Sequence, residues 1–209
     1  MIVKKLPISE PVLLIKNLFS DEEKKLIIDE LNFLCKDYKL LGPEHTGTAT
    51  DKAGKPKKQN RGLFLDEVYG IRNISDILGI TRRYYSEEFL SCVEKFDPVF
   101  KYLRRSNSDS TLLSYYENKS YYESHEDQSI ISIITYYWKE EKKFTGGDLT
   151  FPSHDYTVEL LPWDVIVFPS FIEHRVESMN LLPDIKENEL NGRVSITNFA
   201  SRRDITKGS

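Results

Sequence analysis

The segment Ser124-His125-Glu126-Asp127 combines an imidazole and two carboxylates within four residues. His125 and Asp127 are two residues apart, and on an extended strand this spacing places both side chains on one face. An imidazole and a carboxylate on one face are two of the three ligands of a 2-His-1-carboxylate site, the usual holder of non-haem Fe(II). With 4 histidines and 33 acidic residues in the chain, one such pair arises by chance about half the time. The remaining chain must therefore supply a third ligand.

His174 is the candidate for that third ligand. It follows the apolar run VIVFPSFIEH, which turns at Pro169-Ser170 and can return a histidine to the same end of a barrel. The competitor, His154, lies in a polar turn and is expected at the surface, and His45 is expected to be exposed in a polar loop. Glu126 is expected to face away from the metal ligands, because successive side chains of a strand alternate in direction.

A basic side chain near the end of the chain complements this cluster. Arg193 opens a strand-like run in Gly192-Arg193-Val194-Ser195, and a guanidinium can grip a carboxylate through two parallel hydrogen bonds. Ser195 shares the strand face of Arg193 and can add a hydroxyl donor. A co-substrate with two carboxylates would need such a cation deep in its pocket. The simpler alternative is an ordinary surface arginine.

Helical patterns dominate the first half of the chain. A short strand is predicted over 12–16, and the capping-box spacing of Ser20 and Glu23 predicts a helix over 21–38. A second helical region is predicted over 74–105, with a core-facing stripe that includes Phe96. Its candidate starts are Ser75, Ser86 and Asp97. Between the two regions, residues 41–62 are rich in Gly, Thr and Lys, which predicts a long polar loop, either solvated and mobile or a flap over a substrate.

After residue 110 the pattern changes to that of short strands. Apolar runs separated by turn signals predict strands over 111–117, 129–138, 148–151, 156–160, 164–168, 173–179 and 193–200. Helices followed by strands indicate a mainly β sandwich or open barrel with helices packed on one sheet. The length of 209 residues favours one domain, 1–209, with helical support over 1–106 and a barrel core over 111–201.

The net charge and the cysteine content indicate which binding partners and which cellular compartment to expect. The net charge of −4 gives no basic field for nucleic acid or an anionic membrane, so neither is expected as a partner. The N-terminal segment is interrupted by Pro7 and Pro11 and fits neither a signal peptide nor a membrane span. Cys35 and Cys92 are far apart and are interpreted as buried thiols of a reducing compartment, so the expected location is the cytoplasm.

Five motifs occur in an order that resembles a known family. Tyr116, His125-x-Asp127, Gly146-Gly147, His174 and Arg193-x-Ser195 follow the order found in 2-oxoglutarate- and Fe(II)-dependent dioxygenases, most closely in the prolyl-4-hydroxylase-like branch. The segments YENKSYYESHED, TGGDLTF, LPWDVIVFPSFIEHRV and GRVSITNF carry the likeness, which covers about residues 11–201 together with the opening PVLLIKNLFSDEEKKLI.

Two positions depart from the pattern of this branch. The distance from His174 to Arg193 is 19 residues, longer than usual, and the insert predicts a loop at the barrel mouth. The glycine that follows the branch's tyrosine is Lys119 here, which bears on the shape of that turn and on no ligand.

The resemblance implies a double-stranded β-helix, a cupin-like jelly roll, with supporting helices. It implies Fe(II) bound by His125, Asp127 and His174. It also implies that the distal carboxylate of 2-oxoglutarate is bound by Arg193, Ser195 and Tyr136, with Tyr116 near the metal-bound end. Tyr137, which has the opposite strand parity, is the alternative to Tyr136.

The implied reaction is oxidative decarboxylation of 2-oxoglutarate by O2, giving succinate and carbon dioxide, coupled to hydroxylation of an unactivated C–H bond. Ascorbate is a candidate accessory reductant. Asp127 favours hydroxylation, because related halogenases lack the acidic ligand, and Phe199 stands where the alkylated-base demethylases carry a second arginine. The expected substrate is a peptidyl proline in a peptide or protein. The alternatives are a free amino acid or other small molecule, or a non-catalytic cupin-like binding protein.

Overall fold

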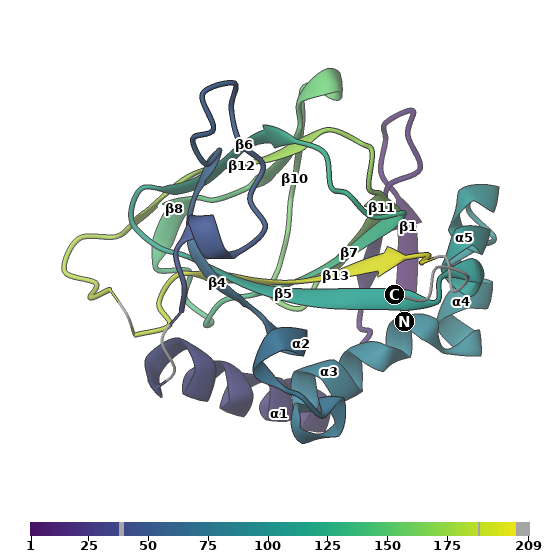
Figure 1. Ribbon diagram of the computed structural model, residues 1–209, viewed down its shortest axis with the longest axis horizontal. Coiled ribbons are helices and arrows are strands. Elements are labelled where there is room, and N and C mark those ends of the chain that lie inside the picture. The colour runs from purple at the N-terminus through teal and green to yellow at the C-terminus, as the bar shows by residue number, and fades with distance from the viewer. Residues whose placement is uncertain (38–39, 188, 204–209) are drawn as a thin grey trace.

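Two antiparallel sheets face each other, and the helices cover the outer face of the larger sheet (Figure 1). The computed structural model describes residues 1–37, 40–187 and 189–203. The larger sheet has the strand order β1-β2-β11-β7-β13-β5-β4. Its strands are β1 Ile2–Lys5, β2 Leu13–Lys16, β11 Val165–Pro169, β7 Ile131–Tyr137, β13 Arg193–Ser201, β5 Ser108–Tyr116 and β4 Arg61–Phe64.

The smaller sheet has the order β10-β9-β12-β6-β3, and β8 also pairs with β12. Its strands are β10 Tyr156–Val158, β9 Leu149–Phe151, β12 His174–Leu181, β6 Ser120–His125, β3 Lys58–Gln59 and β8 Phe144–Gly146. The mainly β jelly roll with supporting helices confirms the predicted fold class.

Strand β7 shows how the sheet divides the core. Its seven residues are all buried, because helices cover one face of the strand and the smaller sheet covers the other. Ile131 and Ile133 pack on the helix side, whereas Ile134 and Tyr136 pack between the sheets. The inward-facing set lines the interior of the barrel.

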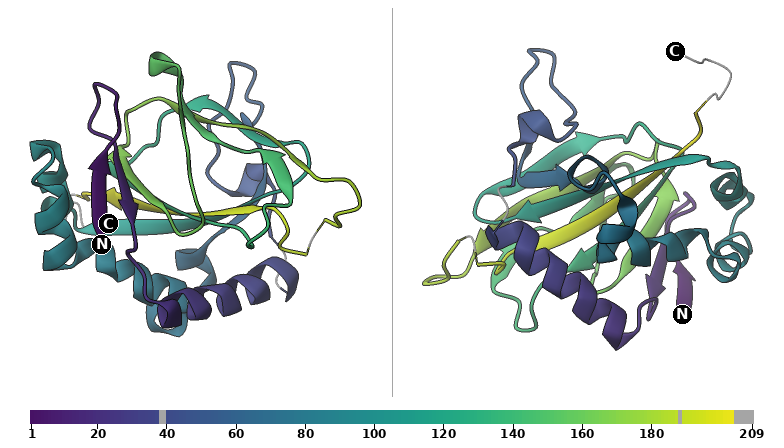
Figure 2. Two further views of the ribbon diagram at one scale, coloured as in Figure 1. Left: turned by 180° about the vertical axis from the view of Figure 1, so that it is seen from behind. Right: turned by 60° about the horizontal axis from the view of Figure 1, so that its bottom comes forward.

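Three of the four predicted caps begin an α-helix, and the fourth, Asp97, begins a 3-10 turn over Pro98–Lys101. Helix α1, Asp21–Asn32, starts at Ser20, whose Oγ accepts a hydrogen bond from the Glu23 backbone at 3.2 Å while Glu23 accepts one from the Ser20 backbone at 2.7 Å. The shorter helices are α2 Leu65–Val68, α3 Asp76–Thr81, α4 Glu87–Val93 and α5 Tyr102–Arg105. Ser75 and Ser86 cap α3 and α4. Figure 2 shows α1 lying along the outer face of the larger sheet.

Two details of the predicted helices differ. The first helix stops as an α-helix at Asn32 and continues as a wider π-turn over Phe33–Asp37, and Tyr38 lies outside the described residues. Phe96, expected on a core-facing stripe, is 39% exposed. Among the described helices, none is long and apolar enough to cross a membrane.

The first 106 residues do more than support the barrel with helices. They contribute β1, β2, β3 and β4 to the two sheets. The predicted loop over 41–62 is therefore wrong at its end, where Lys58 pairs with Tyr122 and Arg61 pairs with Tyr115. The part before it folds back on itself, and the Lys57 backbone donates to the Ala49 carbonyl at 2.9 Å. Pairing with long strands stabilises these short ones, which carry little pattern of their own.

The insert before Arg193 lies at the other end of the barrel from the one predicted. It connects Leu181, the last residue of β12, to Arg193, the first residue of β13. His174 stands at the beginning of β12, so the insert is a full strand length away from it.

Candidate metal centre

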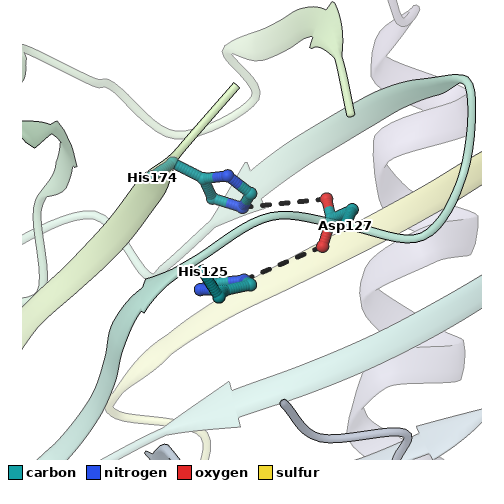
Figure 3. A group of neighbouring side chains, drawn as sticks. All are labelled: His125, Asp127 and His174. Atoms are coloured by element: carbon teal, nitrogen blue, oxygen red, sulfur yellow. Dashed lines mark ion pairs between the residues drawn. The ribbon is translucent and has the colours of Figure 1, made fainter. Parts of the chain in front are cut away.

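Three side chains meet inside the barrel: His125, Asp127 and His174 (Figure 3). One ligand atom of each lies within 4.8 Å of the other two. Nε2 of His125 lies 3.7 Å from Oδ1 of Asp127, and Nε2 of His174 lies 3.7 Å from Oδ2. The two histidines are direct partners in the antiparallel register of β6 and β12. Strand pairing therefore brings them together across 49 residues of chain, the difference between 174 and 125.

Backbone carbonyls set the orientation of both imidazoles. Nδ1 of His125 lies 2.8 Å from the Glu123 carbonyl oxygen, and Nδ1 of His174 lies 2.9 Å from the Ile172 carbonyl oxygen. A carbonyl only accepts, so each Nδ1 carries a proton, and in a neutral ring this leaves Nε2, on the side of Asp127, with a lone pair. Burial, and then the neighbouring His174, lower the pKa of His125 to about 3, which keeps its ring neutral. Two nitrogen lone pairs and a carboxylate thus converge, a donor set that fits Fe(II).

Asp127 lies just beyond the end of β6 rather than on the strand. Its backbone N–H donates to the Ser170 carbonyl at 2.9 Å, and its Oδ2 accepts a hydrogen bond from Ser132 Oγ at 2.5 Å. Ser132 is linked at 2.9 Å to the Ser170 hydroxyl, which lies 2.5 Å from that of Ser129. A serine relay (Ser129, Ser170 and Ser132) therefore fixes the carboxylate, in place of the strand geometry assumed from the sequence.

At the far end of the same interior, Arg193 is almost fully buried, with 2% of its surface exposed. Its guanidinium carbon lies 4.5 Å from the ring centre of Tyr116 and 5.1 Å from that of Tyr136. One guanidinium N–H group donates to the Gly147 carbonyl. The buried Nε has no hydrogen-bond partner, and no carboxylate pairs with this guanidinium in the part of the chain that the structure describes. A buried cation in that condition fits an anionic ligand.

The Gly146-Gly147 pair allows this contact because both glycines have positive φ, +67° and +73°. A Cβ on Gly146 would lie 2.0 Å from the Ser178 carbonyl oxygen. Only glycine therefore lets this segment approach β12 closely, and this approach brings the Gly147 carbonyl to Arg193.

Strand register places the other candidate residues around Arg193. Tyr116 is the partner of Arg193 across β5 and β13, and Ser195 is the partner of Tyr136 across β13 and β7. Tyr137 packs on the helix side, with its ring centre 4.8 Å from that of Trp163. The structure thus places Tyr136, and not Tyr137, in the interior, while its contact with a co-substrate stays a prediction.

Both groups line one narrow cavity of about 40 Å³. Its walls include the three clustered ligands at one end and Arg193 at the other, together with Ser195, Tyr116 and Tyr136. The polar residues singled out in the sequence therefore share one enclosed space.

An outer pocket of about 420 Å³ adjoins this cavity. Tyr122, Asp127 and Phe199 line both spaces. Residues 47–49 of the predicted loop form part of its wall, and a role in covering a substrate stays a prediction. Glu126 is exposed and lines the outer pocket without joining the metal cluster.

Two residues beside the cluster had no clear signal in the sequence. Tyr122 stacks on His125 with ring centres 3.4 Å apart, and its hydroxyl accepts a hydrogen bond from the Ala49 backbone at 3.1 Å. Lys58 is 3% exposed and donates to the Thr46 carbonyl at 3.0 Å. Burial lowers the pKa of Lys58 to about 8. A lysine in a polar loop gives no hint of burial, which arises only when β3 pairs with β6.

The remaining histidines and the cysteines lie away from the cluster. The His45 side chain is 63% exposed, as expected, whereas His154, expected at the surface, is partly buried with Nε2 beside a carboxylate oxygen of Glu10. Cys35 is buried, and burial raises the pKa of its thiol to about 12, whereas Cys92 is only half-buried.

Comparisons with known proteins concern the fold. No protein-family model and no curated protein matches the sequence. Among solved structures, a Pseudomonas putida prolyl-4-hydroxylase is similar with a TM-score of 0.59 and 14% identity, over 94% of this chain and 95% of that one. A Burkholderia pseudomallei oxidoreductase of the 2OG-Fe(II) oxygenase family is similar with a TM-score of 0.57 and 16% identity, over 93% and 86% of the two chains.

A viral collagen prolyl hydroxylase from Paramecium bursaria Chlorella virus-1, solved as a complex with 2-oxoglutarate, is also similar. Its TM-score is 0.52 and its identity 14%, over 91% of this chain and 94% of that one. The chain thus has the fold of the prolyl-4-hydroxylase-like 2-oxoglutarate oxygenases, with a His-Asp-His cluster inside it.

Proposed function

We propose that this chain is a 2-oxoglutarate- and Fe(II)-dependent oxygenase that hydroxylates an unactivated C–H bond of a peptidyl proline. One observation carries the proposal: a single cavity has three converging metal-ligand atoms at one end and a buried guanidinium without a counter-ion at the other. A metal ion suits the first end and a carboxylate suits the second.

Each end has a defined part in binding. His125, Asp127 and His174 would hold Fe(II), and Arg193 would receive the distal carboxylate of 2-oxoglutarate. When Fe(II), 2-oxoglutarate and O2 are bound, they would supply the oxidative decarboxylation to succinate and carbon dioxide and the oxidation of a nearby C–H bond.

The surrounding residues orient these groups and keep water out. Tyr116 and Tyr136 flank the guanidinium, and burial raises the pKa of both phenols, so they stay protonated as hydrogen-bond donors. Ser132 holds one oxygen of Asp127 through a hydrogen bond. An enclosed site of fixed dipoles strengthens each of these interactions.

The outer pocket supports a peptide as the substrate. Residues 47–49 form part of its wall, and it adjoins the cavity at Asp127. The likeness to prolyl-4-hydroxylases favours proline as the oxidised residue. A free amino acid would enter the same pocket and is the alternative outcome of the test below.

The test is succinate formation by purified protein supplied with Fe(II), 2-oxoglutarate and O2, with proline-containing peptides or free amino acids added in parallel. We expect peptides to stimulate succinate formation and to gain one oxygen atom. His174→Ala should abolish turnover, whereas the matched control His154→Ala should keep it. Turnover that survives His174→Ala, or an absence of succinate in every mixture, would contradict the proposal.

A further inference from the structure

The outer pocket combines aromatic walls with uncompensated negative charge. Phe64, Phe199 and Tyr122 supply its apolar surface, and Glu126 and Asp127 are the charged side chains among its lining residues. Asp127 belongs to the metal cluster. Glu126 is exposed at the lip and forms no ion pair with any cation in the described ranges 1–37, 40–187 and 189–203. One carboxylate is therefore free to meet a ligand.

Two lysines that contact β6 form no ion pair with this carboxylate. Lys57 donates its ammonium to the Ser124 carbonyl at 3.1 Å, and Lys58 donates to the Thr46 carbonyl. Lys58 is also packed 5.3 Å from the ring centre of Tyr122 and is almost fully buried. Neither lysine lines the outer pocket, so Glu126 is the carboxylate that a ligand there would meet.

We propose that the outer pocket selects a peptide that carries a lysine or arginine side chain close to the oxidised residue, with Glu126 as the specificity-determining residue. The cationic head would pair with the Glu126 carboxylate, and the methylene stem would lie on Phe64 and Phe199. The aromatic faces add attraction for the cation. This inference rests on the proposed function, because it names the substrate class of the same site.

The expected size of the effect follows from exposure. Glu126 lies at an open lip, so water and salt screen the pair, and we expect a preference of about 5-fold for cationic over neutral peptides at low salt. The preference should fall as salt rises, because exposed charges are screened over about 10 Å at 0.1 M ionic strength.

The experiment is capture of a synthetic peptide library by immobilised protein. Each peptide has acetylated and amidated ends, a fixed central proline and randomised flanking positions. We expect the wild-type protein to enrich lysine and arginine, Glu126→Gln to lose that enrichment and Glu126→Lys to enrich aspartate and glutamate. Glu159→Gln, which removes an exposed carboxylate outside the pocket, is the matched control and should behave like the wild type.

Equal residue composition in peptides captured by wild type and Glu126→Gln would overturn the inference, as would failure of the wild type to retain any peptide. Capture needs no turnover, so the proposed function is measured separately as succinate formation by the wild type and Glu159→Gln. Succinate formation without charge selection contradicts only the role of Glu126, and charge selection without succinate contradicts only the proposed reaction.

Discussion

At one end of the barrel cavity, His125, Asp127 and His174 turn acceptor atoms toward one another, and at the other end Arg193 buries a donor that lacks an acceptor. The first end is incomplete without a cation and the second without an anion. No single protein side chain satisfies both. The contrast therefore points to two ligands in one cavity, a metal and a carboxylate co-substrate.

The two ends are also built differently. The metal end depends on the pairing of His125 with His174 and on the serine relay that holds Asp127. The arginine end depends on close backbone approach, because Gly147 brings its carbonyl to Arg193. Substitutions should consequently damage one end without damaging the other.

The largest effect is expected from Asp127→Asn. The amide keeps the shape of the side chain but removes the negative charge that a divalent cation needs, so metal binding and succinate formation should fall at least about 100-fold. Metal titration by calorimetry measures the loss. Asp148→Asn, which alters a carboxylate outside the metal cluster, is the control, and equal losses in both variants would show that the effect is not local.

Arg193→Met should separate binding from stability. It removes the partner of the distal carboxylate, so the affinity for 2-oxoglutarate should fall about 30-fold or more, as when one member of a buried charge pair is lost. The free energy of unfolding without ligands should stay the same or rise, because an unpaired buried charge is removed. Urea unfolding and 2-oxoglutarate titration measure the two quantities. A large loss of stability would mean that Arg193 serves the fold instead.

Ser132→Ala tests the relay behind the metal end. Asp127 loses the hydrogen bond at Oδ2, and removal of such an outer partner typically weakens metal binding about 10- to 100-fold. Ser132→Thr restores a hydroxyl and should recover most of the affinity. If the Ser132→Ala variant binds metal as tightly as the wild type, the serine relay has no positioning role.

Lys58, which packs on the ring of Tyr122, gives a smaller and pH-dependent effect on stability. Its pKa falls from 10.5 to about 8 on folding, mainly by burial and against the attraction of Asp127. Between these values the unfolded chain holds the proton that the folded chain has lost, so the unfolding free energy rises with pH across that window. Relative to Lys58→Met, the wild type should gain about 1–3 kcal/mol from pH 8 to 10.5. Urea unfolding at each pH measures this difference. The same difference in unfolding free energy between the wild type and Lys58→Met at every pH would contradict the prediction.

Local pattern predicted the parts of the fold that local physics controls. Ser20 and Glu23 form the expected capping box, and the inward parity of Tyr136 over Tyr137 follows from strand alternation. The convergence of His125 with His174 was suggested by motif order and is produced by strand register.

Features made only by tertiary pairing gave no such signal. The burial of Lys58, the stacking of Tyr122 on His125 and the serine relay join segments that are distant in the chain or lack a pattern. The predicted position of the insert before Arg193 was wrong, because sequence spacing alone does not say at which end of the barrel a strand begins.

The most direct test of the two-ended cavity is anaerobic titration of 2-oxoglutarate into metal-free and Mn(II)-loaded protein, for the wild type and Arg193→Met. We predict tight binding only to the Mn(II)-loaded wild type, while Arg193→Met still binds Mn(II) with wild-type affinity. Equal 2-oxoglutarate affinity in both proteins, or loss of Mn(II) binding on substitution of Arg193, would contradict the assignment of the two ends.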